Sequence, residues 1–133
     1  MILVDTSVWI DLLSRRPTHR LKRDQMPQLV TTGVIIQEVV QGASSEETAS
    51  VLEADMLALQ RVADPMELAL FRAASRLYRL ARRRGYTVRS STDCLIAAIA
   101  IENPIAVWHD DRDFDALAKV SELEVHRGVN LPA

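Results

Sequence analysis

The sequence MILVDTSVWIDLL, residues 1–13, decides the fold. Four apolar residues lead into Asp5, Thr6 and Ser7, and an amphipathic run follows. A short apolar run bounded by carboxyl and hydroxyl residues predicts a buried strand that turns directly into a helix. We therefore expect Asp5 at the carboxyl end of the first strand, which in an open parallel sheet is the edge where ligands bind.

The composition predicts one globular domain over residues 1–133. Hydrophobic residues make up 48% of the chain, which argues against disorder, and the net charge of −2 singles out no class of partner. A single cysteine, Cys94, excludes an internal disulfide and a cysteine-based zinc site. With no secretion signal and no apolar run of membrane-spanning length, we expect a cytoplasmic protein that makes no membrane contact.

Strand-like and helix-like segments alternate along the rest of the chain. Further strands are expected at 29–32, 59–62, 105–108 and 123–125. A short helix is expected from about Thr18, and further helices over 33–41, from a capping box between Ser44 and Glu47 to about 57, from Pro65 to about 84, and over 92–102. A last helix follows the acidic residues after the fourth strand and ends at about 119. This alternation predicts an α/β fold with a parallel sheet, in which the carboxyl ends of the strands share one edge.

Asp5 and Glu38 each have a structural interpretation beside a functional one. Asp5 would also suit the cap of the helix that follows it, where its carboxylate accepts from backbone N–H groups. Glu38 lies on the polar side of its helix, where most glutamates are simply solvated. Taken singly, neither residue identifies a site.

Asp93 and an acidic group that follows the fourth predicted strand are stronger candidates. Asp93 falls in the first turn of its helix, where it suits a capping box with Ser90, but it shares a helical face with apolar residues, and a buried carboxylate needs a partner. A turn with a helix cap needs one acid, whereas this strand is followed by Asp110, Asp111 and Asp113.

These acids gain weight from their common location. Asp5 and Asp111 follow the two most apolar strands, and Glu38 and Asp93 are expected near helix starts, all of which meet at one edge of a parallel sheet. Crowded carboxylates repel one another, and an oxygen-only ligand set suits Mg²⁺ or Mn²⁺. Such a cation activates water and neutralises charge on a phosphate, so the sequence predicts metal-dependent phosphodiester or phosphate chemistry. His109, the histidine at this edge, is expected to be structural.

The same residues resemble a known family. The segments MILVDTSVWID, VIIQEVVQG around Glu38, STDCLIAAIA around Asp93 and HDDRDFDAL around Asp111 and Asp113 resemble a PIN domain, in particular the VapC ribonuclease toxins of bacterial VapBC toxin–antitoxin pairs. The likeness covers about residues 1–125. The opening D-T-S-x-W and the closing D-R-D-F are its most specific parts.

The resemblance implies about five parallel strands with helices on both faces, and an Mg²⁺- or Mn²⁺-dependent endoribonuclease that acts as the toxin of a type II toxin–antitoxin system. It implies a catalytic quartet formed by Asp5, Glu38, Asp93 and Asp111. The implied metal ligands are Asp5, Asp93, Asp111 and Asp113, supported by the hydroxyls of Thr6 and Ser7. Asp110 stands where the family usually has asparagine or threonine, which leaves open which of Asp110, Asp111 and Asp113 ligates directly.

The resemblance also implies partners. It implies a VapB-type antitoxin that places an arginine against the carboxylates, an RNA substrate such as tRNA or rRNA, and a homodimer that joins the antitoxin in a hetero-oligomer. Arginines recur at helical spacing around Arg76, a pattern typical of a solvent-exposed helix face. RNA contact is the alternative, because a site that acts on a polyanion needs nearby positive charge. The candidates for RNA contact are Arg15, Arg16, Arg76 and Arg112, and Arg89 is a further one.

Two other functions fit parts of the sequence. A metal-dependent phosphatase or phosphoacceptor domain also has acids at strand ends, but a phosphatase of the haloacid-dehalogenase type needs D-x-D where this chain has Asp5, Thr6 and Ser7. A non-catalytic relative that only holds RNA or a protein partner is disfavoured because every acid of the quartet is present.

Overall fold

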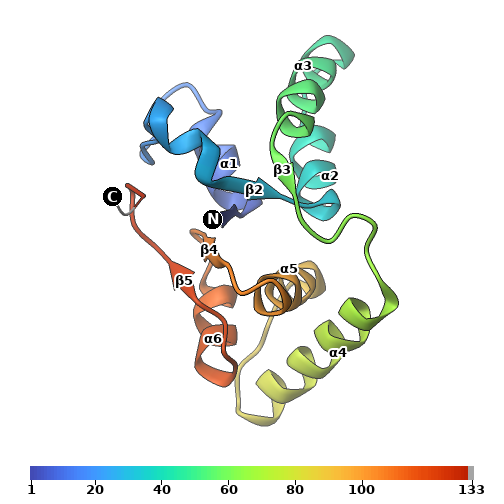
Figure 1. Ribbon diagram of the computed structural model, residues 1–133. Helices are drawn as coiled ribbons and strands as arrows, with labels where there is room; N and C mark the ends of the chain where they lie inside the picture. The colour runs from blue at the N-terminus through green and yellow to red at the C-terminus, as the bar shows by residue number, and fades with distance from the viewer. Residues whose placement is uncertain (132–133) are drawn as a thin grey trace.

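The computed structural model describes residues 1–131 and has a parallel sheet at its centre (Figure 1). The strands are β1 (Ile2–Val4), β2 (Leu29–Thr31), β3 (Gln60–Arg61), β4 (Ala106–Trp108) and β5 (Val125–His126). Their order is β3-β2-β1-β4-β5, and every neighbouring pair is parallel. The predicted α/β fold with about five parallel strands is therefore confirmed, and β1 is its central strand.

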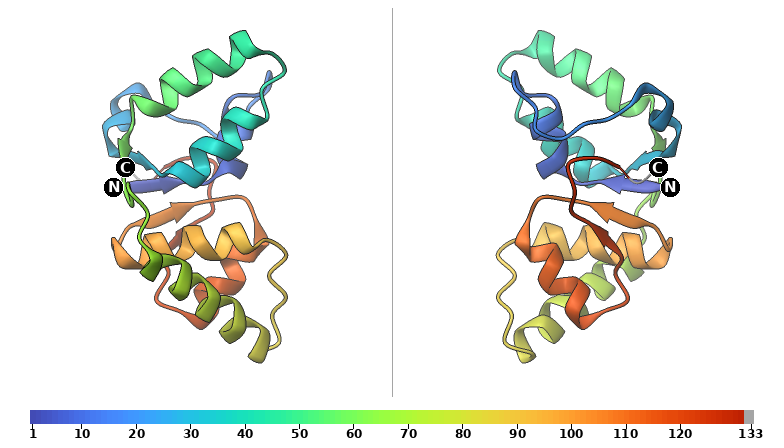
Figure 2. Two further views of the ribbon diagram at one scale, coloured as in Figure 1. Left: turned by 90° about the vertical axis from the view of Figure 1, so that its right-hand side faces the viewer. Right: turned by 90° about the vertical axis from the view of Figure 1, so that its left-hand side faces the viewer.

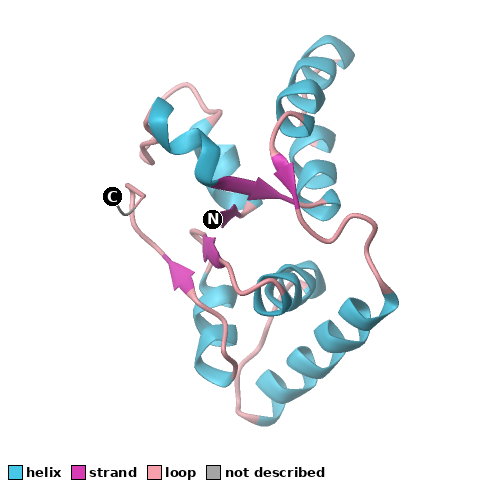
Figure 3. Ribbon diagram, viewed as in Figure 1, coloured by secondary structure: helices cyan, strands magenta, loops and turns pink. Residues whose placement is uncertain are grey.

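Helices connect the strands and pack in two groups on opposite sides of the sheet. One group consists of α1 (Thr6–Leu12), α2 (Gly33–Gln41) and α3 (Glu46–Leu57), together with a 3₁₀-helix, η1 (Arg23–Gln28). The other consists of α4 (Leu68–Arg83), α5 (Ser91–Glu102) and α6 (Arg112–Val120). The two groups lie above and below the strands in Figure 2, and Figure 3 shows how helices and strands alternate. Within residues 1–131, no helix combines the length and the apolar character needed to cross a membrane.

The core is built around β1 and β4, which are covered on both faces. Val4 and Val107 are completely buried, and two-sided burial explains why both strands are continuous apolar runs. α5 packs against α4 and β4, and Ile96 and Ile99 on it are also completely buried. Its apolar residues go all the way round, as expected for a helix in the interior of a domain. This burial fixes the first turn of α5, which carries Asp93.

The segment before β2 differs from the prediction, because no helix forms at Thr18. The side chain of Asp11 accepts hydrogen bonds from the backbone N–H groups of Thr18, at 3.1 Å, and His19, at 2.7 Å. The N–H of Arg20 donates to the carbonyl of Val129 at 2.6 Å. These bonds hold the segment against α1 and Val129, and no helix forms between α1 and η1.

The start of α4 was also predicted wrongly. The helix begins at Leu68 rather than at Pro65, because the chain turns sharply first, with Ala63 in the left-handed region at φ 54°. Its end is as predicted: Gly85, at φ 85°, adopts a conformation that favours glycine and stops the helix.

Two smaller differences concern a cap and a strand. The Oγ of Ser45 caps α3 by accepting from the N–H of Thr48 at 3.1 Å, so the cap lies one residue after the expected Ser44. The last strand covers Val125–His126 instead of 123–125. Short edge elements of this kind carry little periodic signal in the sequence.

Candidate active site

Asp5 combines the two roles that the sequence left open. It follows β1 and caps α1, and its Oδ2 accepts from the N–H of Ser7 at 3.1 Å and from the Ser7 Oγ at 2.6 Å. The residue is 3% exposed. Burial raises the pKa of Asp5, and the bonds from Ser7 oppose that shift. Asp5 is thus a helix cap and, at the same time, a buried acid at the carboxyl edge of the sheet.

Hydroxyl groups at the start of α1 join this edge together. The Oγ1 of Thr6 donates to Glu38 Oε1 at 2.9 Å, and the Oγ of Ser7 accepts from the N–H of Asp110 at 3.0 Å. Glu38 lies in the middle of α2 rather than near its start, which corrects the expectation. Burial raises the pKa of Glu38, the bond from Thr6 lowers it, and the charge of Asp5 raises it further. Thr6 therefore links Glu38 to this edge of the sheet.

Three carboxylates form the centre of the site. Asp93, Asp111 and Asp113 each present an oxygen, and these oxygens lie within 4.8 Å of one another. We call these three residues the acidic cluster. Asp93 is buried in the first turn of α5, and its Oδ2 has no hydrogen-bond partner among residues 1–131. Ser90 makes no side-chain cap, so the capping-box interpretation of Asp93 is wrong.

Burial and neighbouring charges act together on Asp93. Desolvation raises its pKa most, the charges of Asp5, Asp111 and Asp113 add to this, and the result is a pKa of about 8. A carboxylate in such surroundings is stabilised by a positive charge. Asp5 contributes to this crowding even though it is not one of the three residues whose oxygens lie within 4.8 Å of one another.

Asp111 and Asp113 also organise the backbone around the cluster. Asp111 caps α6, with its Oδ1 accepting from the N–H of Asp113 at 2.9 Å. The Oδ2 of Asp113 accepts from the N–H groups of Arg89, at 3.1 Å, and Ser90, at 3.3 Å, which ties the loop before α5 to α6. The Arg89 side chain contacts both acids, whereas the sequence analysis named Arg89 only as a further candidate for RNA contact. The one indication in the sequence was that Arg89 lies three residues before the pair Thr92 and Asp93.

Asp110 is directed to a different set of partners. Its Oδ1 lies 3.7 Å from Arg127 Nε, and Arg127 Nη1 also binds Asp115. His109 is completely buried, and its Nδ1 accepts from the N–H of Asp111 at 3.1 Å. Burial lowers the pKa of His109, which favours the neutral ring that this hydrogen bond requires. Asp110 is therefore paired with Arg127 and not with the acidic cluster. His109 supports the loop between β4 and α6 through its bond to Asp111.

The donor set fits a hard divalent cation. Carboxylate and hydroxyl oxygens are the ligands that Mg²⁺ and Mn²⁺ prefer, and sulfur takes no part. The buried Oδ2 of Asp93 without a partner is an acceptor that a cation would satisfy. The site thus offers what metal-assisted chemistry on a phosphate needs: several converging anionic oxygens at one edge of the sheet.

The four arginines expected to contact RNA are all exposed, at three separate places. Arg15 and Arg16 lie in the turn after α1. Arg76, on α4, lines a groove between α4 and α5. Arg112 opens α6 and lines a hollow that also includes Tyr86 and Lys119.

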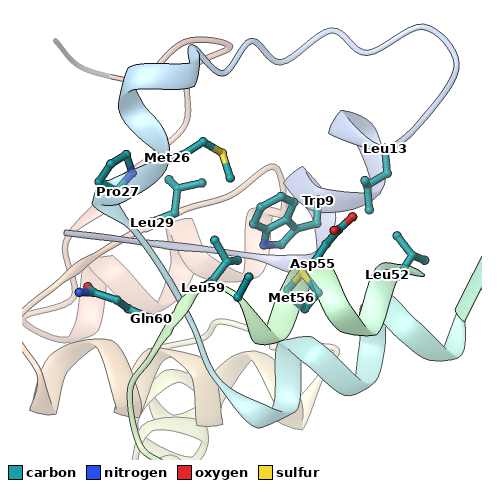
Figure 4. A pocket seen from close by; sticks show the side chains of 11 residues that line it. Trp9, Leu13, Met26, Pro27, Leu29, Leu52, Asp55, Met56, Leu59 and Gln60 are labelled. Atoms are coloured by element: carbon teal, nitrogen blue, oxygen red, sulfur yellow. The ribbon is translucent and has the colours of Figure 1, made fainter. Parts of the chain in front are cut away.

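An apolar cavity of about 540 Å³ lies between α1, η1 and α3 (Figure 4). The Trp9 ring lies near Leu29 and Leu59, with Met26 and Met56 close by. The Nε1 of Trp9 is buried without a hydrogen-bond partner among the described residues. Buried indole N–H groups normally have a partner, so this group is an exception among the buried polar groups of the described residues.

Comparison with known proteins identifies the family. A family model of the PIN domain matches residues 2–120. Ribonuclease VapC11 of Mycobacterium tuberculosis is 36% identical over 132 residues, covering 93% of this chain and 96% of that protein. The crystal structure of VapBC2 from Rickettsia felis, bound to a promoter DNA fragment, has a TM-score of 0.74 at 14% identity and covers 98% of both chains. VapBC-5 of Mycobacterium tuberculosis has a TM-score of 0.68 at 24% identity and covers 95% of this chain and 97% of that one.

The chain therefore belongs to the PIN-domain family and, within it, to the VapC ribonucleases. The resemblance seen in the sequence is confirmed, and the two solved structures share the fold of this chain.

Proposed function

We propose that this chain is a metal-dependent endoribonuclease and the toxin of a type II toxin–antitoxin pair. One observation carries the proposal: Asp93, Asp111 and Asp113 each present a carboxylate oxygen within 4.8 Å of the others, and the buried Oδ2 of Asp93 has no partner among residues 1–131, in a chain of the VapC family. Crowding of this kind costs native stability unless a cation is bound, so a functional reason is needed to maintain it.

The proposed metal ligands are Asp93, Asp111 and Asp113, with Asp5 beside them, and the cation is Mg²⁺ or Mn²⁺. When bound, the metal supplies an activated water and neutralises charge on the phosphodiester. Glu38 completes the catalytic quartet, and Thr6 orients its carboxylate through the 2.9 Å hydrogen bond. Ser7 holds Asp5 and the Asp110 backbone together, which keeps the ends of β1 and β4 in register.

The proposed substrate is RNA, with tRNA and rRNA as the candidates. The sheet edge is acidic, so a polyanion has to be held by basic side chains around it. Among the four candidates Arg15, Arg16, Arg76 and Arg112, Arg112 is the best placed because it begins the helix that Asp111 caps, and the other three would contact more distant parts of the RNA.

The proposed partner is a VapB-type antitoxin, and we place the pair, with a toxin homodimer, in the cytoplasm. The apolar cavity around Trp9 supports a protein partner, because an apolar antitoxin segment would cover its apolar lining. Expression of the chain alone should arrest bacterial growth, and co-expression of the cognate antitoxin should relieve the arrest. Harmless expression of the chain alone would contradict the toxin role.

The substitution Asp5→Asn tests the enzymatic role against the capping role. Asparagine caps a helix about as well as aspartate, so the fold should persist. Loss of the charge should lower Mg²⁺-dependent RNA cleavage by roughly 100-fold or more. The control is Asp24→Asn, an exposed acid in η1, before β2. Cleavage should also stop in a chelator.

Two outcomes would contradict this proposal. One is an Asp5→Asn variant that cleaves RNA at the wild-type rate, which would reduce Asp5 to a cap. The other is a wild-type protein that hydrolyses a small phosphomonoester and leaves RNA intact, which would favour the phosphatase alternative.

A further inference from the structure

Arg89 is the basic side chain in contact with the acidic cluster. Its Nη2 lies 3.3 Å from Asp111 Oδ1, and its Nε lies 3.5 Å from Asp113 Oδ1. Among residues 1–131, no other arginine or lysine nitrogen lies within 4.0 Å of a carboxylate of the cluster. Tight charge-assisted bonds are shorter, about 2.7–2.9 Å, so the guanidinium rests against the acids without being locked to them.

The backbone of Arg89 is held while its side chain stays accessible. The N–H groups of Arg89 and Ser90 both donate to Oδ2 of Asp113, whose side chain is only 3% exposed. The residue before, Val88, is buried in the core. The Arg89 side chain is 55% exposed. A fixed base with an accessible guanidinium suits a group that exchanges one anionic partner for another.

The charge around the cluster requires such a group. The charge of Asp5 acts on Asp93 and also on Glu38, so a single divalent cation leaves this edge of the sheet negative. An RNA phosphate that approaches this edge is repelled unless a further positive charge lies within a few ångströms. A guanidinium is suited to this because its planar fork matches two phosphate oxygens.

We propose that Arg89 is a phosphate-binding residue of the active site. In this proposal the guanidinium leaves Asp111 and Asp113 and donates to the non-bridging oxygens of an RNA phosphate, while both carboxylates remain for the cation. Only the side chain needs to move, because Asp113 holds the backbone. The inference rests on the proposed function, since it deepens the way in which the same site holds RNA.

Steady-state kinetics on a short RNA test the proposal, with Arg89→Gln, Arg89→Lys and a matched control, Arg23→Gln. Arg23 is exposed in η1, which leads into the amino end of β2, at the opposite edge of the sheet from the acids. Arg89→Gln should raise KM by roughly 10- to 100-fold, the loss expected for one charge-assisted contact, with a smaller change in kcat. Arg89→Lys should recover part of the loss, and Arg23→Gln should match the wild type.

A second readout, without RNA, separates phosphate binding from a structural role. Mn²⁺ titrated into Arg89→Gln in a calorimeter should bind as tightly as in the wild type or more tightly, because a competing positive charge is gone. With Mn²⁺ bound, the melting temperature of Arg89→Gln should match that of the wild type, because the backbone bonds to Asp113 remain and the cation neutralises the acids.

The other possible results contradict either the assignment of Arg89 or the proposed function. An unchanged KM in Arg89→Gln, weaker Mn²⁺ binding or a lower melting temperature with Mn²⁺ bound overturns the assignment of Arg89 while the wild type still cleaves RNA. A wild type that cleaves no RNA overturns the proposed function itself, and the inference with it.

Discussion

Two carboxylate environments in this molecule are opposites. In the turn formed by Asp11, Thr18 and His19, the Asp11 carboxylate accepts from both backbone N–H groups and from both side chains, at 2.7–3.1 Å. These bonds, that from the His19 N–H most of all, hold the pKa of Asp11 well below its usual value. In the acidic cluster, burial raises the pKa of Asp93 most, the surrounding carboxylates raise it further, and the pKa is about 8.

A structural carboxylate and a metal-binding carboxylate differ in whether hydrogen-bond donors or acceptors surround them. Donors surround Asp11, so its negative charge is already satisfied and it fixes the course of a loop. Acceptors surround Asp93, and its Oδ2 has no hydrogen-bond partner among residues 1–131, so its charge remains to be satisfied by a cation. Both are aspartates on helices, and their burial and their neighbours distinguish them.

The largest expected effect comes from Asp93→Asn. The variant should lose roughly 100-fold or more of its Mg²⁺-dependent RNA cleavage, because one converging charge is removed from the site. Asp110→Asn is the matched control, since Asp110 pairs with Arg127 at 3.7 Å instead of joining the cluster. Its cleavage should stay within about twofold of the wild type, as expected for an exposed ion pair. Equal losses in both variants would erase the distinction between these acids.

The next effect is on stability, in the Asp11 turn. Asp11→Asn replaces an oxygen that accepts from His19 with an amide NH₂ that cannot accept, so the melting temperature should fall by several degrees. Glu53→Gln, an exposed acid on α3, should leave it unchanged. RNA cleavage below the melting temperature should survive in both. Loss of cleavage in folded Asp11→Asn would show that the turn has a catalytic part that its contacts do not reveal.

The smallest effect is a pH dependence of stability in a chelator. Aspartate titrates near 3.8 when unperturbed, whereas folded Asp93 titrates near 8, next to Asp5, Asp111 and Asp113. Between these values the folded state binds more protons than the unfolded state, so the free energy of unfolding falls as pH rises. Asp93→Asn removes this titration, and its stability should therefore decline less between about pH 4 and 8. Urea unfolding in a chelator measures this free energy for the wild type and Asp93→Asn. An equal decline with pH in the two proteins would contradict the role given to Asp93.

Much of the framework could be predicted from the sequence, because it depends on local patterns. Continuous apolar runs marked β1 and β4, and parallel strands bring their carboxyl ends to one edge. Asp93 stood out because it shares a helical face with apolar residues. These signals need only a few neighbouring residues, so no long-range contact had to be known.

The remainder depends on contacts between residues far apart in the sequence. Glu38 joins the site through Thr6, 32 residues away, and Arg89 through acids more than 20 residues away. The course of the loop after α1 is set by Asp11 and by the carbonyl of Val129, which no periodicity reveals. Asp110 could not be separated from Asp111 until Arg127 was placed.

The most direct test of the account is calorimetric titration of Mn²⁺ into the wild-type protein and into Asp93→Asn. The central claim is that carboxylates gathered at the ends of β1 and β4 and at the start of α5 form a cation site. The account predicts that the wild type binds Mn²⁺ and that folded Asp93→Asn binds it at least about tenfold more weakly. Equal affinity in the two proteins, or no binding by the wild type, would contradict it.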